Sequence, residues 1–311
     1  MVTACMRVNP APQTPLPAAP APRAGGFPPA APTPRSTADL RLRIDALVAH
    51  VTGSEVAVWY QNFATGETLA VSAMVPMHAA STMKVPVMIE LFRRADAGTL
   101  SLEQTTRFEN RFRSIVDGSP YSLSAGDDSD AEMYTLAGKP VTYRELNEHM
   151  ITRSSNLATN VLIEFLDAKI VNATSRSLGA DGMTVLRGVE DTKAFEKGLN
   201  NMTTARALGA LLEAIEHGRA ASAMACDEMR SVLLRQTETG ELPAGLPPGT
   251  KIAHKTGWIT ATTHDAAIIY PPGRAPYVLV VLTRKIPDRP VAQRLMAEIS
   301  RAVWESATAS R

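Results

Sequence analysis

The strand-like sequence of this chain lies near its two ends, and a mostly helical stretch separates the two groups. Short apolar and β-branched runs bounded by turn residues predict strands. The expected strands are Glu55–Asn62, Glu67–Ala73, Lys251–Thr256, Thr263–Tyr270 and Tyr277–Thr283. Apolar residues at helical spacing predict a helix at each end, Ser36–Val51 and Pro290–Trp304. The simplest assembly is an α+β fold, an α/β/α sandwich in which one antiparallel sheet is built from both chain ends, flanked by helices, with an all-α subdomain inserted.

Composition separates the start of the chain from the rest. Residues 1–35 are crowded with Pro and Ala and show no periodic apolar pattern, so we expect a flexible tether there. Residues 36–311 are expected to fold as one domain. Within it, residues 36–75 and 219–311 would form the α/β part, and residues 76–218 the helical part. We expect a ligand-binding cleft where the two parts meet.

The helical middle carries local start signals and two irregular stretches. Thr142-Tyr-Arg-Glu145 is a capping box that opens a helix. Asn156–Leu166 shows helical spacing that places Phe165 among the inward-facing residues. Asn110–Lys139 and Gly182–Met202 show neither pattern. Loops of this length inside a compact domain are usually functional or poorly ordered.

The charge balance argues against a polyanionic partner. The chain has 32 basic and 31 acidic residues with no Lys/Arg block, so nothing favours nucleic acid or an anionic membrane. No apolar run reaches the roughly 18 residues that span a bilayer. We therefore expect a monomer with no nucleic-acid partner and no membrane span.

The two cysteines do not predict a disulfide, because Cys5 lies in the tether and Cys226 in a helical stretch. Val2-Thr3-Ala4-Cys5 resembles the lipid-attachment site that ends a bacterial lipoprotein signal, although the charged and apolar regions of such a signal do not precede it. We expect an exported, periplasmic protein, with a lipid anchor at Cys5 as one option. The six histidines lack metal-binding spacing, so we expect no metal and no cofactor.

The first chemically suggestive motif is Ser81-Thr-Met-Lys84, which opens an apolar helical run that ends near Gly98. A serine three residues before a lysine on a helix places the two side chains on one face, about 5–6 Å apart between Cβ atoms. A desolvated lysine amine at that distance could take the serine proton. Taken alone, the pair favours an ordinary surface Ser and Lys over a catalytic pair.

Three further pieces suggest a site when they are taken together. Ser154-Ser155-Asn156 lies between two expected helices and is, alone, ordinary helix-capping sequence. Lys255-Thr256-Gly257 lies at the end of an expected strand, where the lysine and hydroxyl could bind a carboxylate. Gly257 would allow a ligand to approach the backbone. Glu190, in the second irregular stretch, could hold a water molecule as a general base or could simply be a solvated acid.

S-x-x-K, S-D-N and K-T-G, in this order, are the signature of class A β-lactamases and penicillin-binding proteins. The chain resembles the class A serine β-lactamase family from about Ser36 to Ser306. Two longer segments also look like that family, residues 81–88 like its nucleophile helix and residues 254–273 like its closing hairpin. The interval from Asn156 to Glu190 suits the glutamate of the family's Ω loop.

The resemblance implies that Ser81 is the acylated nucleophile and that Lys84 accepts its proton, with Glu190 acting through water as the alternative base. Ser154 would pass a proton to the leaving lactam nitrogen. Glu190 would activate the deacylating water. Asn156 would hold the substrate amide and the lysine.

The resemblance also assigns substrate binding to Lys255–Trp258, at the end of the expected strand Lys251–Thr256. Lys255 and Thr256 would take the substrate carboxylate, beside Gly257. The backbone N–H groups of Ser81 and Trp258 would form the oxyanion hole, in which one donor is typically worth about 2.7–4 kcal/mol.

The chain also departs from the family pattern. Ser155 stands where the triplet usually has Asp, and Ala194 where the Ω loop usually has a water-holding Asn. Asp191 or Asn200 are the candidates to replace that amide. Trp258 stands where family members carry a small residue, which would narrow the cleft.

No arginine stands in the expected Thr263–Tyr270 strand, so Arg284 or Arg289 are the candidates for a further carboxylate anchor. With these departures we still expect acylation, whereas the rate of deacylation is left open.

Three functions follow from the residues. The first is a serine β-lactamase, acting on a small β-lactam substrate through an acyl-enzyme on Ser81 that water activated by Glu190 hydrolyses. The second is a D-alanyl-D-alanine carboxypeptidase, or a related amidase or esterase, on the same fold. The third is a module that binds a lactam or cell-wall fragment without turnover.

Overall fold

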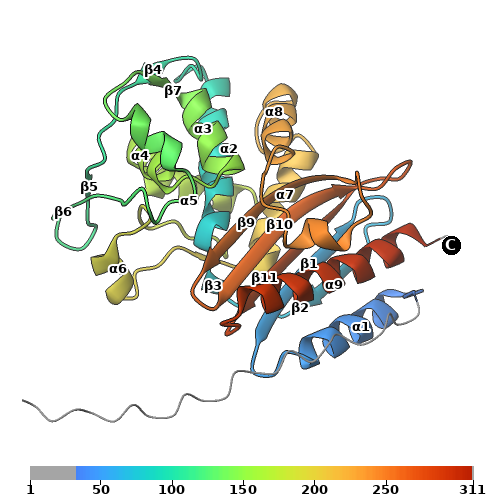
Figure 1. Cartoon of the computed structure of the whole chain (residues 1–311). Coiled ribbons are helices and arrows are strands. Elements are labelled where there is room, and N and C mark those ends of the chain that lie inside the picture. Colours follow the sequence, from blue (N-terminus) through green and yellow to red (C-terminus); the bar gives the residue numbers. More distant parts are fainter. Residues whose placement is uncertain (1–32, 310–311) are drawn as a thin grey trace, which may run out of the picture.

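The computed structural model describes residues 33–309. Its centre is a five-stranded antiparallel sheet with the strand order β2-β1-β11-β10-β9. The strands are β1 (Glu55–Asn62), β2 (Thr68–Val71), β9 (Lys251–Ile259), β10 (Thr262–Tyr270) and β11 (Tyr277–Arg284). The pairing of β1 with β11 joins the two ends of the folded region in one sheet (Figure 1). The predicted α+β architecture is therefore confirmed.

Helices cover both faces of the sheet because strand side chains alternate between the faces. On β11, Leu279 and Val281 pack with α1 (Thr37–Ala49) and α9 (Arg289–Thr308) in one core. Val278 and Val280 pack on the other side, in the larger core that includes the helical part. Figure 1 shows α1 and α9 together on one side of the sheet and the remaining helices on the other.

The inserted part is mainly helical. Its helices, with α7 and α8 beside the sheet, are α2 (Lys84–Asp96), α3 (Tyr143–Thr152), α4 (Asn156–Leu166), α5 (Ala168–Ser177), α6 (Thr192–Glu196), α7 (Ala205–Glu216) and α8 (Ala223–Leu233). Short 3-10 turns are η1 (Ala80–Met83), η2 (Ala131–Leu136) and η3 (Leu242–Gly245). Two-residue strands are β3 (Met77–His78), β4 (Thr105–Thr106), β5 (Phe112–Arg113), β6 (Pro120–Tyr121), β7 (Val141–Thr142) and β8 (Met202–Thr203).

The helix α2 is the central element of the inserted part. All of its residues from Lys84 to Phe92 are buried, and α3, α4, α5 and α8 contact it. The helix ends before Gly98, whose φ of +69° is the left-handed conformation that glycine adopts at low cost. The sequence predicts a helix from Ser81, whereas the structure forms a 3-10 turn over Ala80–Met83 before the α-helix begins at Lys84. This tighter turn sets the position of Ser81 relative to Lys84.

Within residues 33–309, no helix combines the length and hydropathy needed to cross a bilayer. The predicted tether lies almost wholly outside the described residues, as does Cys5. Cys226 is a buried free cysteine in α8. The proposed division of the folded region into two parts stays a prediction.

Candidate active site

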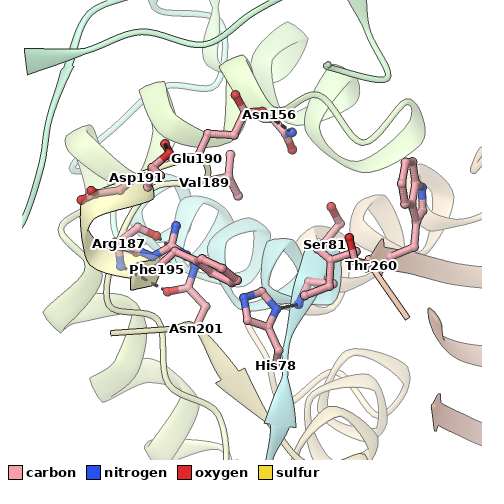
Figure 2. Close-up of a pocket in the computed structure, with 14 residues that line it drawn as sticks. His78, Ser81, Asn156, Arg187, Val189, Glu190, Asp191, Phe195, Asn201 and Thr260 are labelled. Carbon is pink, nitrogen blue, oxygen red and sulfur yellow. Dashed lines mark hydrogen bonds between the residues drawn. The ribbon is translucent and has the colours of Figure 1, made fainter. Parts of the chain in front are cut away.

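The predicted residues gather where η1, the α3–α4 junction, the loop before α6 and β9 meet. A cavity of about 340 Å³ lies there. Ser81, Asn156, Glu190 and Trp258 are among its lining residues. Figure 2 shows Ser81, Asn156 and Glu190 around a common space. Lys84, Ser154 and Lys255 lie buried beside it and connect to it through hydrogen bonds.

Ser154 lies between two buried lysines. Lys84 Nζ donates to the Ser154 hydroxyl at 3.1 Å, and Lys255 Nζ donates to the same oxygen at 2.9 Å. Both lysines have 0% exposure. Ser154 has a φ of +60°, an uncommon conformation for a residue with a Cβ that tends to occur at functional sites. This arrangement connects the two amines through one hydroxyl.

The burial of the two lysines changes their proton affinity. Burial, and then the nearby charge of Lys255, holds the pKa of Lys84 well below its usual value, although the charges of Asp128 and Glu190 oppose this. Burial lowers the pKa of Lys255 to about 7, against the opposing charge of Asp265. A lysine with a lowered pKa is partly neutral near pH 7 and can accept a proton.

Lys84 is held by three acceptors rather than by Ser81. Besides the Ser154 hydroxyl, its Nζ donates to the Ser154 carbonyl at 2.6 Å and to Asn156 Oδ1 at 3.0 Å. The half-buried Ser81 makes no side-chain hydrogen bond to any residue within 33–309, so its expected contact with the Lys84 amine is not formed in this structure. Catalytic hydrogen bonds in unliganded enzymes often form only when the substrate binds.

The backbone of β9 passes directly beside the η1 turn that carries Ser81. A Cβ added at Gly257 would lie 2.7 Å from the Ser81 nitrogen and 2.9 Å from the Thr82 nitrogen. Only glycine permits this approach. A glycine at position 257 is therefore required by the close packing of β9 against η1, in addition to being part of the motif.

The register of β9 gives a second backbone donor. A two-residue loop joins Ile259 to Thr262, so these residues form a hydrogen-bonded pair and Trp258 falls on the next, non-hydrogen-bonded position. Since β9 is an edge strand, the N–H of Trp258 points off the sheet. The η1 turn that carries Ser81 contacts the same strand.

Glu190 reaches the cavity from the loop between α5 and α6. Its Oε1 accepts a hydrogen bond from Asn156 Nδ2 at 2.9 Å, and its φ is +62°. Asn160 fixes the preceding backbone, accepting from Val189 N at 2.6 Å and donating to Val189 O at 3.0 Å. Burial raises the pKa of Glu190, helped by the charge of Asp128, while the hydrogen bond from Asn156 and the charge of Lys84 lower it. A carboxylate with a raised pKa is a stronger base.

Asn156 connects the two possible bases. Its side-chain oxygen accepts from Lys84, and its side-chain nitrogen donates to Glu190. The side chain is fixed at the start of α4, where Ser155 Oγ caps the helix by accepting from Ala158 N at 3.2 Å. Ser155 therefore performs a capping role in place of the acid of the usual triplet.

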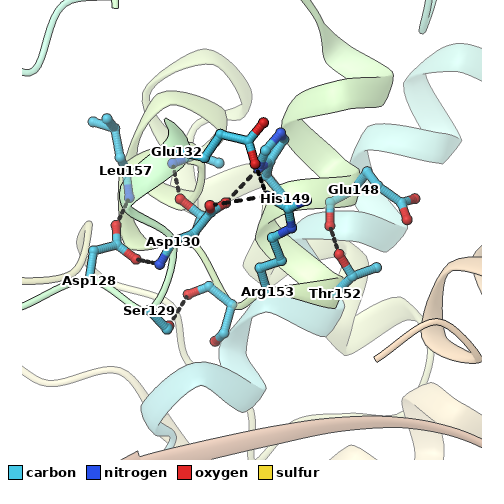
Figure 3. A network of polar contacts seen from close by, with 12 residues as sticks. Asp128, Ser129, Asp130, Glu132, Glu148, His149, Thr152, Arg153 and Leu157 are labelled. Carbon is cyan, nitrogen blue, oxygen red and sulfur yellow. Dashed lines mark hydrogen bonds and ion pairs between the residues drawn. The ribbon is translucent and has the colours of Figure 1, made fainter. Parts of the chain in front are cut away.

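Asp128 is a residue that the sequence analysis missed. Its carboxylate accepts from the backbone N–H groups of Asn156 and Leu157, each at 3.0 Å, and from the Tyr134 hydroxyl at 3.1 Å. Figure 3 shows Asp128 beside Asp130, which contacts His149 at 2.5 Å. An acid in an irregular stretch carries no sequence signal for this long-range contact. It supplies negative charge at the positive end of α4.

The candidates for the missing Ω-loop amide are engaged elsewhere. Ala194 is fully buried and apolar. The Asp191 carboxylate accepts from Ser114 Oγ, Ile115 N and Ala194 N at 2.8–3.1 Å. Asn200 accepts from Arg187 at 3.2 Å. The carboxylate of Asp191 is therefore committed to holding the loop, whereas Asn200 uses only its side-chain oxygen in the contact with Arg187.

The two arginines suggested as carboxylate anchors are also paired. Arg284 bonds Glu55 with its Nε at 2.6 Å. Arg289 contacts Glu241 at 3.0 Å and lies 4.7 Å from the centre of the Trp258 ring. Trp258 is 52% exposed and lines the cavity rim. The buried Thr256 follows Lys255 on β9, so its side chain points to the opposite face of the strand.

Within the described residues, no group of three or more His, Cys, Asp or Glu side chains could hold a metal ion.

The chain is similar to known β-lactamases over most of its length. It is 28% identical over 276 residues to a β-lactamase of Streptomyces albus G, covering 87% of this chain and 85% of that protein. Its structure matches an ancestral class A β-lactamase (GNCA) with a TM-score of 0.75 at 27% identity, over 86% of this chain and 99% of that one. It also matches a PBP-A mutant solved as an acyl-enzyme complex with penicillin G, with a TM-score of 0.73 at 26% identity, over 86% and 96% of the two chains.

The model of the β-lactamase enzyme family matches residues 39–307, which include every residue assigned to the site above. The similarity to a structure named as a class A β-lactamase supports membership of the same family. The chain belongs to the β-lactamase enzyme family.

Proposed function

We propose that this protein is a serine β-lactamase that hydrolyses the lactam ring through an acyl-enzyme on Ser81. The observation that carries the proposal is the hydrogen-bonded group around Ser154 and Asn156. It joins two buried lysines to a carboxylate beside an accessible serine. If this network served only to stabilise the fold, it would not need Ser81 beside it. Within residues 33–309, the Ser81 side chain makes no hydrogen bond, which leaves its hydroxyl available for a reaction.

Acylation begins at the serine hydroxyl. As Ser81 Oγ attacks the lactam carbonyl, its proton passes to the neutral amine of Lys84, whose lowered pKa makes that form accessible. The alternative acceptor is Glu190 through a water molecule. The N–H groups of Ser81 and Trp258 stabilise the oxyanion.

Ring opening needs a proton at the lactam nitrogen. Ser154 supplies it when the C–N bond breaks, and the proton returns to its oxygen from the adjacent lysines at 2.9–3.1 Å. The product of this half-reaction is an ester of Ser81. Lys255 binds the substrate carboxylate.

Deacylation uses the carboxylate on the other side of the cavity. Glu190 takes a proton from water, the hydroxide attacks the ester carbonyl, and the Ser81 oxygen leaves as that same proton is returned to it, which restores the Glu190 carboxylate. The raised pKa of Glu190 favours this step, since it makes the carboxylate a better base. The amide of Asn156 orients it.

The test is turnover of a chromogenic cephalosporin by the purified protein. The proposal predicts sustained hydrolysis over many enzyme equivalents. A burst of one equivalent followed by a stop would contradict it. A stable adduct with no turnover of any substrate would instead support the binding module.

A second candidate is a D-alanyl-D-alanine carboxypeptidase or related amidase or esterase. Buried, apolar Ala194 favours it, because that position supplies no polar partner for a deacylating water. Release of D-alanine from a peptidoglycan stem peptide, without turnover of the cephalosporin, would favour this function over the first.

We further propose that the protein is exported to the periplasm and acts as a monomer. Val2-Thr3-Ala4-Cys5 is the sequence that supports a lipid anchor. Mass spectrometry of the protein expressed from its full coding region would reveal the acyl groups on Cys5.

A further inference from the structure

A histidine that belongs to none of the motifs lies three residues before the nucleophile. His78 is half-buried at the end of β3 and lines the same cavity as Ser81. Its Nδ1 lies 3.0 Å from the backbone nitrogen of Ala80. Because a backbone N–H can only donate, Nδ1 accepts this bond and the neutral ring carries its proton on Nε2. Figure 2 shows the imidazole beside the Ser81 turn.

The bond from the Ala80 nitrogen lies directly before an unusual backbone conformation. Ala80 has a φ of +46°, in the left-handed region that residues with a Cβ rarely adopt. The imidazole closes a short turn from His78 to the Ala80 nitrogen, much as an Asx side chain does when it accepts the N–H two residues on, so the bond fixes the peptide plane between Ala79 and Ala80. The conformation of Ala80 determines the direction of the next N–H, which is that of Ser81.

A second histidine anchors the first to the sheet. His264 Nε2 lies 2.8 Å from the His78 carbonyl oxygen, and a carbonyl only accepts, so this nitrogen donates. The ring is fully buried on β10. On the other side, Ala79 N donates to Asn201 O at 2.8 Å. The backbone around His78 is therefore fixed from both sides, and its side chain is left to hold Ala80.

The ionisation of His78 is compatible with this role. Burial, and then the charges of Arg187 and His264, lowers the pKa of His78 to about 4. Burial also lowers the pKa of His264 to about 4. Both rings are neutral near pH 7, so Nδ1 of His78 keeps the lone pair that accepts from Ala80.

We propose that His78 is a positioning residue for the oxyanion hole: its Nδ1 fixes the peptide plane that leads into Ala80, and from that plane the left-handed conformation of Ala80 directs the Ser81 N–H toward the reacting carbonyl oxygen. The role rests on the proposed function of Ser81 as the nucleophile. The Ser81 nitrogen lies only 2.7 Å from where a Cβ on Gly257 would stand, so this N–H has little room to rotate without moving β9.

A pair of nearly isosteric substitutions tests the proposal. Asparagine places an acceptor where Nδ1 lies, whereas leucine has a similar shape and no acceptor. We expect His78→Leu and His78→Ala to lower the acylation rate constant for a penicillin by about tenfold or more, toward the 10²–10³-fold loss of an oxyanion donor. We expect His78→Asn to stay within about threefold of the wild type, and the dissociation constant before acylation to change little in all three.

Phenylboronic acid gives a second measurement. The Ser81 oxygen adds to boron and releases its proton, and the resulting tetrahedral anion presents an oxygen to the same N–H groups. Its affinity should fall in the Leu and Ala variants and return in the Asn variant. Thermal unfolding of each variant, with exposed His50→Asn as the matched control, separates this effect from a loss of folding.

Equal acylation and boronate affinity in all variants would overturn the role of His78. Equal losses in the Asn, Leu and Ala variants at wild-type melting temperature would overturn it too, because the acceptor would then be irrelevant. If the wild type does not react with penicillin, the proposed function fails, and boronate binding still decides the role of His78. Failure of the wild type to bind boronate as well would overturn both.

Discussion

Ser81 and Lys84 lie on regular secondary structure, whereas Glu190 lies on a loop. The nucleophile and the two lysines belong to η1, α2 and β9, and both lysines are fully buried. Glu190 is half-buried on the stretch before the five-residue helix α6. The groups proposed for acylation are thus fixed by the core of the fold, while the base proposed for deacylation depends on loop contacts. Changes in the loop should alter deacylation and leave acylation nearly intact.

The largest effect is expected from removing the nucleophile. Ser81→Ala should lower hydrolysis of a chromogenic cephalosporin by about 10⁴-fold or more, since no other group in the proposed mechanism forms the ester. Spectrophotometric rates at high enzyme concentration measure the loss. An activity within tenfold of the wild type would show that the acylation half has been assigned to the wrong residue.

Removing the loop carboxylate should separate the two halves. Glu190→Gln keeps the shape of the side chain and its contact with Asn156 but removes the base, so deacylation should slow by about 10²–10⁴-fold. The burst of acylation, measured by stopped flow, should stay within about tenfold of the wild type. If acylation falls as much as deacylation, Glu190 is also the acylation base and the two halves are not independent.

Loosening the loop at a distance should have a smaller effect. Buried Arg187 donates to Leu199 O and Gly188 O, each at 3.0 Å, and to Asn200. Arg187→Ala leaves these acceptors unpaired, so we expect a loss of about 1–3 kcal/mol in the free energy of unfolding and about tenfold slower deacylation.

Exposed Lys197→Ala, in the same loop, is the matched control for Arg187→Ala. Denaturant unfolding and single-turnover kinetics measure the two effects. An equal slowing of acylation in Arg187→Ala would contradict the division between the halves.

The smallest effect concerns the pH dependence of substrate binding. The pKa of Lys255 is lowered to about 7, so the side chain is an ammonium below that pH and an amine above it. The KM for an anionic penicillin should therefore rise above pH 7, by up to about tenfold per pH unit. A methyl ester of the same penicillin is the control and should show no such rise. A KM that is flat for both compounds would remove Lys255 from carboxylate binding.

Local signals predicted most of the fold. Asn156–Leu166 was expected as a helix from its spacing, and α4 has those bounds, because its cap and its apolar face lie within one short segment. The strands and their antiparallel arrangement also followed from short-range patterns. Within α4, the prediction that Phe165 faces inward was wrong. It is 38% exposed and packs at the surface against Tyr143, with ring centres 4.4 Å apart.

The sequence predicted the motif residues but not the contacts that position them. Asp128 contacts the backbone of Asn156, 28 residues away, and His78 acts on Ala80 through a turn that has no motif. Such contacts depend on how irregular segments are folded back onto the core, which no periodicity encodes. The engagement of Asp191 with Ser114 and Ile115 belongs to the same class.

The central claim is that Ser81 forms an ester that depends on Glu190 for its hydrolysis. Intact-mass spectrometry with peptide mapping tests it most directly, on the wild type and on Glu190→Gln after mixing with penicillin G. The account predicts that the variant carries one penicillin mass on the peptide containing Ser81, while the wild type returns to its free mass as the penicillin is consumed. A variant with no adduct, an adduct on another peptide, or a wild type that stays acylated would contradict it.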